Sequence, residues 1–185
     1  MLGLDELQPF RCDDGSENLR QITSGATYRC TGSAKLESEK VFIEGTRLRE
    51  KESPWTVLEL GFGIAWNFRL TVAAAIDKGV ELTYHAFEKE PVPQQLLQGN
   101  DIGVLMAQKA LKKARLGQKT IQEVHGRITL NLYPYSWTQD TQQNFNAQAV
   151  YHDPFAPKIN PESWLQDCFR WQLSHSADNV IWASY

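Results

Sequence analysis

Hydrophobic and polar positions alternate with two different periods from residue 53 onward. Short runs rich in β-branched and aromatic residues end abruptly at glycine, proline or charged residues, as buried strands do. They predict strands at residues 55–60, 82–87, 127–132, 147–151 and 180–185. Apolar residues at helical spacing predict helices at 66–77, at about 101–115 and from Pro161 onward. Strands that alternate with helices in this way indicate an α/β sheet that is parallel in its main part.

The first fifty residues are more polar and contain several turn signals, among them the stretch at 13–16. Short runs at 19–22 and 27–30 are candidate hairpin strands, and 36–42 favours a helix. We therefore predict two parts of the chain. Residues 1–50 form a β-rich N-terminal extension, and they pack on a core domain formed by residues 51–185.

Composition limits the class of protein. The chain has 185 residues, of which 42% are hydrophobic and 22% charged, and its formal net charge is −3. These values predict one folded domain with a sizeable core. They argue against a generally basic protein that coats nucleic acid, although a local basic patch is compatible with them. Cys12, Cys30 and Cys168 are an odd and widely spaced set, which predicts a reducing compartment without a disulfide framework.

The sequence also argues against membrane insertion, secretion and metal binding. No run approaches the roughly 18 to 20 apolar residues of a transmembrane helix. The first ten residues carry two acids and no basic residue, unlike a signal peptide. The four histidines lie far apart, and with the cysteines they form no spacing typical of metal ligands. We therefore expect a cytoplasmic protein that binds no metal.

A glycine turn at Glu59–Gly63 follows the first predicted strand of the core. Gly61 and Gly63 allow a tight turn and a close approach of the backbone to a ligand, and the following helix start adds N–H donors. A dinucleotide site would have a third glycine at position 66, where this chain has Trp66, so NAD and FAD are disfavoured. The alternative is an ordinary tight turn of an α/β sheet.

Glu88 follows the second predicted strand, where a carboxylate can accept two hydrogen bonds from the hydroxyls of a ribose. The alternative is a solvated loop acid beside Lys89 and Glu90. Because the carboxyl ends of parallel strands meet at one edge of a sheet, Glu88 and the glycine turn together favour a nucleoside ligand.

The loop at 153–164 begins with Asp153, contains three prolines and carries the aromatic residues Phe155 and Trp164. An Asp at the end of a central strand points into the ligand cleft, and a stiff loop with flat apolar side chains suits a planar base and an amine. The alternative is a proline-rich connection in which Asp153 caps the helix that starts at Pro161.

Five basic residues fall within eleven positions that contain no acid: Lys109, Lys112, Lys113, Arg115 and Lys119. They are candidate contacts to phosphates, and the alternative is a solvated face of a helix. Arg47, Arg49 and Lys51 form a smaller cluster with the same two interpretations.

Taken together, these elements resemble a class I S-adenosylmethionine-dependent methyltransferase. More narrowly, the chain resembles the methyltransferase domain of the MnmC family of bifunctional tRNA wobble-uridine enzymes. The matching segments lie at 24–45, at 57–63 with 67–68, and at 153–164, where the sequence follows the pattern D-x-F-x-P-x-x-N-P-x-x-W. The resemblance covers roughly residues 14–185.

The resemblance implies a Rossmann-like sheet, S-adenosyl-L-methionine as cofactor, and tRNA as partner. It implies methylation of 5-aminomethyl-2-thiouridine at the wobble position to 5-methylaminomethyl-2-thiouridine. The implied cofactor-binding residues are Glu59, Gly61, Phe62, Gly63, Asn67, Glu88 and Tyr135, with Glu88 at the ribose. The implied catalytic residues are Asp153 and Phe155, which face the methyl acceptor. The implied contacts to substrate and tRNA are Lys158, Asn160, Trp164, Lys112 and Lys113.

These residue types suit methyl transfer to an amine, which is an in-line displacement and requires no metal. Alignment of nitrogen, methyl and sulfur supplies much of the acceleration. A carboxylate such as Asp153 can orient the amine, accept its proton or stabilise the developing charge.

The sequence departs from the family at three places. Ala65 stands where the family has glycine, and the stretch at 132–136 lacks the acid that helps to hold the adenine. Tyr135 or Ser136 then lines the adenine pocket, with Asp140 as a more distant substitute. The sheet has five predicted strands rather than seven, because the last two are missing. We expect the N-terminal segment, or a second copy of the chain in a homodimer, to cover the edge of the final strand.

Three other functions stay open at this point. One is a methyltransferase for another amine acceptor, and a second is a non-catalytic protein that keeps the fold for cofactor binding or as a scaffold. A nicotinamide oxidoreductase comes last, because of Trp66.

Overall fold

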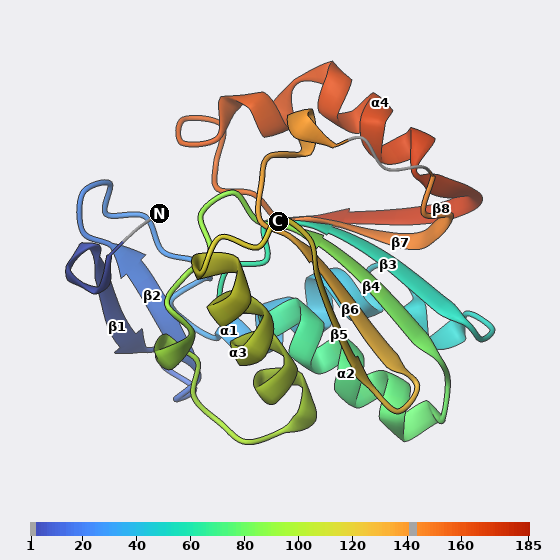
Figure 1. Cartoon of the computed structure of the whole chain (residues 1–185), viewed down its shortest axis with the longest axis horizontal. Coiled ribbons are helices and arrows are strands. Elements are labelled where there is room, and N and C mark those ends of the chain that lie inside the picture. The colour runs from blue at the N-terminus through green and yellow to red at the C-terminus, as the bar shows by residue number, and fades with distance from the viewer. Residues whose placement is uncertain (1–2, 141–143) are drawn as a thin grey trace.

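The computed structural model describes residues 3–140 and 144–185. Six strands form one sheet in the order β5-β6-β4-β3-β7-β8, in which all strands are parallel except β5 (Figure 1). Their bounds are Trp55–Leu60 for β3, Leu82–Phe87 for β4, Ile121–His125 for β5, Ile128–Tyr133 for β6, Ala147–His152 for β7 and Ser176–Ser184 for β8. The predicted α/β sheet, parallel in its main part, is confirmed.

Helices cover both faces of this sheet, with α2 and α3 on one face and α4 on the other (Figure 1). The bounds are Trp66–Lys78 for α2, Ile102–Arg115 for α3 and Gln166–Ser174 for α4. Successive side chains of a strand point to opposite faces of the sheet, so each strand contributes to both helical layers. Val57 lies in the buried cluster that includes residues of α2 and α3, whereas Leu58 packs with Cys168 of α4.

The helix boundaries follow from local sequence. Asp101 caps α3 by accepting a hydrogen bond from the N–H of Val104 at 2.9 Å. Gly79 ends α2 in the left-handed conformation that glycine adopts readily. Pro161 starts a 3-10 turn, η6 at Pro161–Trp164, and α4 begins two residues after it, so the helix predicted from Pro161 is divided in two.

The N-terminal segment forms an antiparallel hairpin and a run of short helices. The bounds are Leu4–Glu6 for η1, Leu7–Arg11 for β1, Glu17–Gln21 for β2, Ala34–Glu37 for α1, Ser38–Glu44 for the π-helix η2 and Leu48–Glu50 for η3. The prediction of strands at 19–22 and 27–30 is wrong in its pairing: residue 27 makes only an isolated bridge, and β1 is the partner of β2. The turn at Asp14 sets this register, because its carboxylate accepts from the N–H of Ser16 at 2.9 Å.

Apolar residues of this segment lie in the same buried cluster as those of α2 and α3, for example Leu19, Phe42 and Leu48. The π-helix η2 contacts both α2 and β8, so the segment covers part of the last strand. The hydrophobic core therefore crosses the predicted boundary at residue 50.

The sheet has six strands where the sequence predicted five. The additional strand β5 pairs with β6 across a turn at Gly126, whose φ is +56°. Its residues after Ile121 are half-buried or exposed, which is why its hydrophobic signal is weak. The last strand begins at Ser176 rather than at 180, because the exposed Asp178 and Asn179 hide its first half in the sequence pattern.

Candidate active site

A cavity of about 800 Å³ opens at the carboxyl ends of the parallel strands. It is lined by Leu60 at the end of β3, by Phe87 at the end of β4, by Tyr135 after β6 and by Asp153 after β7. Tyr28 of the N-terminal segment forms part of the same wall. This is the edge of an open α/β sheet at which ligands bind.

The sheet itself places the first residue of each loop around the cavity. The backbone N–H groups of three such residues each donate to a carbonyl at the end of a neighbouring strand. The bonds run from Gly61 to Phe87 at 3.0 Å, from Glu88 to Tyr133 at 3.0 Å and from Asp153 to Leu60 at 2.9 Å. The ladder thus extends one residue beyond β3, β4 and β7, and it fixes these three residues relative to one another.

The glycine turn is closely surrounded. Gly61 has a φ of +89°, and a Cβ atom at this position would lie 2.2 Å from the carbonyl oxygen of Asp153. Gly63 has a φ of +49°, and its Cβ would lie 3.0 Å from the ring of Tyr28. Positive φ favours glycine at both positions, and at Gly61 the neighbouring backbone also leaves no space for a Cβ atom.

Glu88 is tied to the glycine turn. Its carboxylate accepts hydrogen bonds from the N–H groups of Gly63 and Glu90, both at 2.9 Å. Burial raises the pKa of Glu88, and the two N–H groups oppose that shift. Each carboxylate oxygen keeps a lone pair for a further donor, so the side chain can still accept hydroxyl groups.

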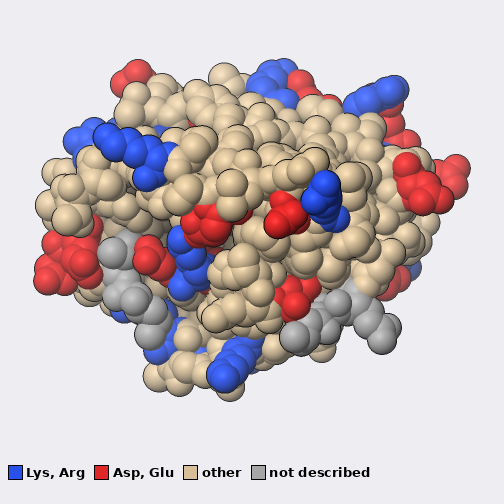
Figure 2. Space-filling view, turned by 90° about the horizontal axis from the view of Figure 1, so that it is seen from above, with Lys and Arg blue, Asp and Glu red and all other residues tan. Residues whose placement is uncertain are grey.

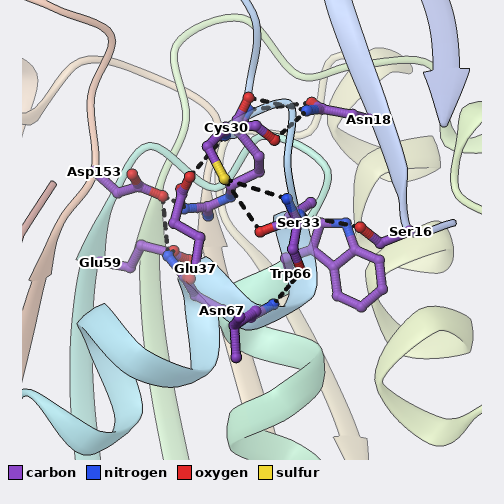
Figure 3. Close-up of polar contacts among 12 residues, drawn as sticks. Ser16, Asn18, Cys30, Ser33, Glu37, Glu59, Trp66, Asn67 and Asp153 are labelled. Carbon is purple, nitrogen blue, oxygen red and sulfur yellow. Dashed lines mark hydrogen bonds and ion pairs between the residues drawn. The ribbon is translucent and has the colours of Figure 1, made fainter. Parts of the chain in front are cut away.

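Behind the cavity wall, one amide joins two carboxylates. Asn67 donates to Glu59 at 2.7 Å and to Asp153 at 3.0 Å (Figure 3). Arg29 forms an ion pair with Asp153 and another with Glu37 at 3.2 Å. Three acidic side chains therefore converge around one guanidinium group.

Burial is the main cause of the perturbed acidity in this cluster. It raises the pKa of Glu59 to about 8, and the nearby Asp153 adds to that shift while Arg29 opposes it. Burial also raises the pKa of Asp153 to about 7, again against Arg29. A carboxyl group that titrates near neutral pH is suited to proton transfer.

Aromatic side chains from separate segments form one side of the cavity. The indole N–H of Trp164 donates to the carbonyl of Phe155 at 2.9 Å, which braces the loop after β7. The Phe155 ring lies edge-on to that of Tyr28, with 4.9 Å between centroids. η6 begins after Asn160, and neither Asn160 nor Asp153 caps it with a side-chain hydrogen bond, so the helix-capping alternative for Asp153 is not observed.

Tyr135 and Ser136 line the cavity on the side of β6, whereas Asp140 does not. Asp140 accepts from the indole N–H of Trp171 at 3.0 Å and lies 3.1 Å from His175. It is therefore part of the packing between the sheet and α4, and it does not replace the acid that the family has near the adenine.

The structure separates the predicted site residues into three groups. Those that line the cavity are Gly61, Gly63, Glu88, Tyr135, Asp153, Phe155, Asn160 and Trp164. Those that are fully buried next to it are Glu59, Phe62 and Asn67. Those outside its lining are Lys158, Lys112 and Lys113.

Sequence reasoning missed Arg29 and Glu37 as site residues, although both line the cavity. Arg29 lies inside the segment whose resemblance to the family was recognised, next to Tyr28. Its contact with Asp153 joins residues far apart in the sequence, so no local spacing could indicate it.

The basic end of α3 lies beside the rim of the cavity. The Arg115 guanidinium donates to the carbonyl of Pro91 at 2.9 Å, and Pro91 directly follows the cavity residue Glu90. Lys112 is exposed, and Lys113 pairs with Glu123 at 2.6 Å. On the face shown in Figure 2, basic and acidic side chains are interspersed, and neither sign covers a continuous area.

Within residues 3–140 and 144–185, no group of three or more His, Cys, Asp or Glu side chains is arranged to hold a metal ion. No helix in the same ranges has both the length and the apolar character to span a membrane.

Comparison with known proteins shows similarity to methyltransferases and to MnmC proteins. A family model described as S-adenosyl-L-methionine-dependent methyltransferase matches residues 101–185. The chain is 29% identical over 180 residues to the tRNA 5-methylaminomethyl-2-thiouridine biosynthesis bifunctional protein MnmC of Hahella chejuensis, with 87% of this chain and 28% of that protein covered. It is 28% identical over 194 residues to the protein of the same name from Burkholderia vietnamiensis, with 94% and 29% covered.

The chain thus spans less than a third of the length of these two relatives. The crystal structure of MNMC2 from Aquifex aeolicus matches the fold with a TM-score of 0.77, at 23% identity, over 97% of this chain and 59% of that one. The predicted Rossmann-like fold agrees with the structural match, and the predicted enzyme class and cofactor agree with the description of the matching family model. The chain is similar over most of its length to MnmC proteins, and its residues 101–185 match the model of a family of S-adenosyl-L-methionine-dependent methyltransferases.

Proposed function

We propose that this chain is an N-methyltransferase that uses S-adenosyl-L-methionine and acts on the 5-aminomethyl group of 2-thiouridine at the wobble position of tRNA. The observation that carries the proposal is the placement of Asp153 and Glu88 in one cavity, beside a turn in which glycine is required. The name of the MnmC relatives specifies the modified uridine.

The residues present fit the cofactor. At the cavity, Glu88 presents a carboxylate whose two oxygens each accept one backbone N–H and keep lone pairs for a ligand. Gly61, Gly63 and Tyr135 would line the cofactor, and Glu88 would accept its ribose hydroxyls. Glu59 is fully buried next to the cavity, so it would contribute an acidic group near the cofactor without touching it. When bound, the cofactor supplies a methyl group on a positively charged sulfur.

Asp153 would orient the acceptor amine and take up its proton. Arg29 and Asn67 both contact Oδ2 of Asp153, so Oδ1 keeps its lone pairs for a ligand. A pKa of about 7 allows the carboxylate to be charged and yet to accept a proton near neutral pH. Phe155 and Trp164 would provide flat surfaces on which the uracil ring stacks.

The tRNA would contact basic residues near the rim. The end of α3 lies next to the cavity, because Arg115 is bonded to Pro91. The exposed Lys112 at this end would contact phosphates of a tRNA bound there. Lys158 is exposed on the loop after β7 and would add a contact there. With a tRNA substrate, we expect the protein to act in the cytoplasm. A homodimer through the outer edge of β8 stays a prediction.

The test is transfer of a labelled methyl group to tRNA that carries 5-aminomethyl-2-thiouridine. We expect transfer by the wild-type chain and a loss of at least about 100-fold for Asp153→Asn, because general-base and orienting roles contribute on that order. The exposed Asp178→Asn serves as the matched control and should transfer normally.

Other outcomes would favour the two alternatives. Cofactor binding with transfer to a small amine but not to tRNA would indicate another acceptor. A folded chain that binds no cofactor would indicate a non-catalytic protein.

A further inference from the structure

We propose that Arg29 is a positioning residue for methyl transfer, because its guanidinium holds Asp153 in place at the cavity wall and keeps its carboxylate charged. The inference rests on the proposed function for the role of Asp153 in the reaction. Arg29 belongs to the N-terminal segment, so a residue outside the predicted core domain would complete the site.

The position of Arg29 is fixed from both sides. The backbone N–H of Arg29 donates to the side chain of Asn18 at 3.1 Å, and the backbone carbonyl of Arg29 accepts from the same side chain at 2.9 Å. The guanidinium lies over the ring of Phe42, 5.5 Å from its centroid, and the side chain is 3% exposed. A buried cation held this firmly defines where its carboxylate partner lies.

The two partners of Asp153 leave one of its oxygens available. Arg29, from the N-terminal segment, and Asn67, from α2, both contact Oδ2, and together they restrain the position of this oxygen. Asp153 lines the cavity, and Oδ1 is the oxygen that an acceptor amine would approach.

The charges around Asp153 make the cation necessary. Glu37 and Glu59 are the other acids of the cluster, and both are buried. Two phenols, Tyr84 and Tyr151, lie near Glu59, and burial raises the pKa of each, so they stay neutral. Arg29 is the cation that pairs with both Asp153 and Glu37, so without it the buried Asp153 would hold its proton at neutral pH.

A protonated Asp153 could neither accept a proton from the amine nor stabilise its positive charge. Loss of Arg29 should therefore change the pH at which the enzyme works, and not merely its stability. A residue that only supported the fold would lower the amount of folded protein and leave the pH profile unchanged.

The experiment compares Arg29→Gln and Arg29→Lys with Arg20→Gln in the full chain. Arg20 is a matched control, because it lies in the same segment over the ring of Phe10, at 5.2 Å, but is exposed. The first readout is the titration of the Asp153 carboxyl carbon by NMR without substrate, assigned with Asp153→Asn. The second is the pH profile of kcat/KM for methyl transfer to the aminomethyl tRNA.

We expect Arg29→Gln to raise the titration midpoint of Asp153 by at least about one pH unit, since a contacting opposite charge lowers a carboxyl pKa by 1–3 units. The acidic limb of kcat/KM should move upward equally, which gives a loss of roughly fivefold or more at pH 7. Arg29→Lys should restore part of the shift, and Arg20→Gln should show none.

An unmoved midpoint in folded Arg29→Gln would overturn the inference, and so would a loss of activity without any movement of the acidic limb. If Arg29→Gln does not fold, the pair Arg29→Gln/Glu37→Gln removes one acid together with the cation, and the upward shift should be smaller but keep its sign. A wild-type chain that transfers no methyl group would count against the proposed function, while the midpoint of Asp153 still decides the role of Arg29.

Discussion

The side-chain amide of Asn67 donates a hydrogen bond to the carboxylate of Asp153 at 3.0 Å, although the two residues are 86 positions apart. The same amide nitrogen donates to Glu59 at 2.7 Å. The first helix after the glycine turn thereby connects the end of β7 to the end of β3. This link depends on two hydrogens of one nitrogen, so its removal affects two buried acids at once.

Replacing Asn67 by leucine keeps the branching and the number of side-chain heavy atoms and removes both donors. We expect a loss of about 1–3 kcal/mol in the free energy of unfolding, the usual cost of leaving a buried polar group without its partner. Urea unfolding at neutral pH measures it. The exposed Asn100→Leu is the control and should change stability little. A loss below about 0.5 kcal/mol for Asn67→Leu would show that the link is not structural.

Gly61→Ala tests the close approach between the glycine turn and the loop after β7. An alanine with positive φ costs about 1 kcal/mol wherever it stands. At Gly61 the new Cβ also meets the carbonyl of Asp153, so we expect about 1–3 kcal/mol in addition. Gly117→Ala isolates the first cost, because Gly117 has a φ of +92° with nothing within 4 Å of its Cβ position. Equal losses for the two variants in thermal unfolding would argue against the steric contact.

Ala65 has a φ of +64° and precedes α2, at the position where the family has glycine. Ala65→Gly relieves about 1 kcal/mol of left-handed strain and gives up a buried methyl group of about 0.8 kcal/mol. We therefore expect stability within about 0.5 kcal/mol of the parent. Ala74→Gly, in the interior of the same helix, should cost about 1 kcal/mol or more. A comparable loss in the free energy of unfolding for Ala65→Gly and Ala74→Gly would contradict the backbone strain at Ala65.

Stability should fall between pH 6.5 and 8. The pKa values of Glu59, about 8, and Asp153, about 7, lie above those of unfolded carboxyl groups, so the folded state holds protons that the unfolded state has released. The fall should be on the order of 1 to 2 kcal/mol. His85 and His152 act in the opposite direction and below this window, since burial lowers the pKa of each to about 4.

The check is the denaturant midpoint across this pH range for the parent and for Glu59→Gln/Asp153→Asn. The double variant should show a flatter dependence, whereas Glu81→Gln, an exposed acid, should keep the slope of the parent. A parent whose stability rises from pH 6.5 to 8 would contradict the assignment.

The sequence predicted the elements whose residues are buried on both faces, such as 55–60 and 82–87, because continuous apolar runs are a strong signal. β5 was missed because only its first residue carries an apolar, buried side chain. The partner of β2 was misplaced because β1 contains Pro9, which weakens its strand pattern.

The site residues likewise divide into those with a signal in the sequence and those without one. Gly61, Glu88 and Asp153 could be predicted because each directly follows a strand, and the carboxyl ends of parallel strands meet. Arg29 and Glu37 could not, because Arg29 in a loop and Glu37 at the end of α1 reach the cavity through the tertiary packing of the N-terminal segment, which has no ligand-binding pattern of its own.

The most direct test of the account is calorimetric titration of the folded chain with S-adenosyl-L-methionine. We predict a single site with micromolar affinity, at least about tenfold weaker in Glu88→Ala because the ribose hydroxyls lose a charged acceptor. The exposed Glu81→Ala should bind like the parent. A folded chain that gives no binding heat, or a Glu88→Ala variant that binds normally, would contradict the assignment of this cavity to the cofactor.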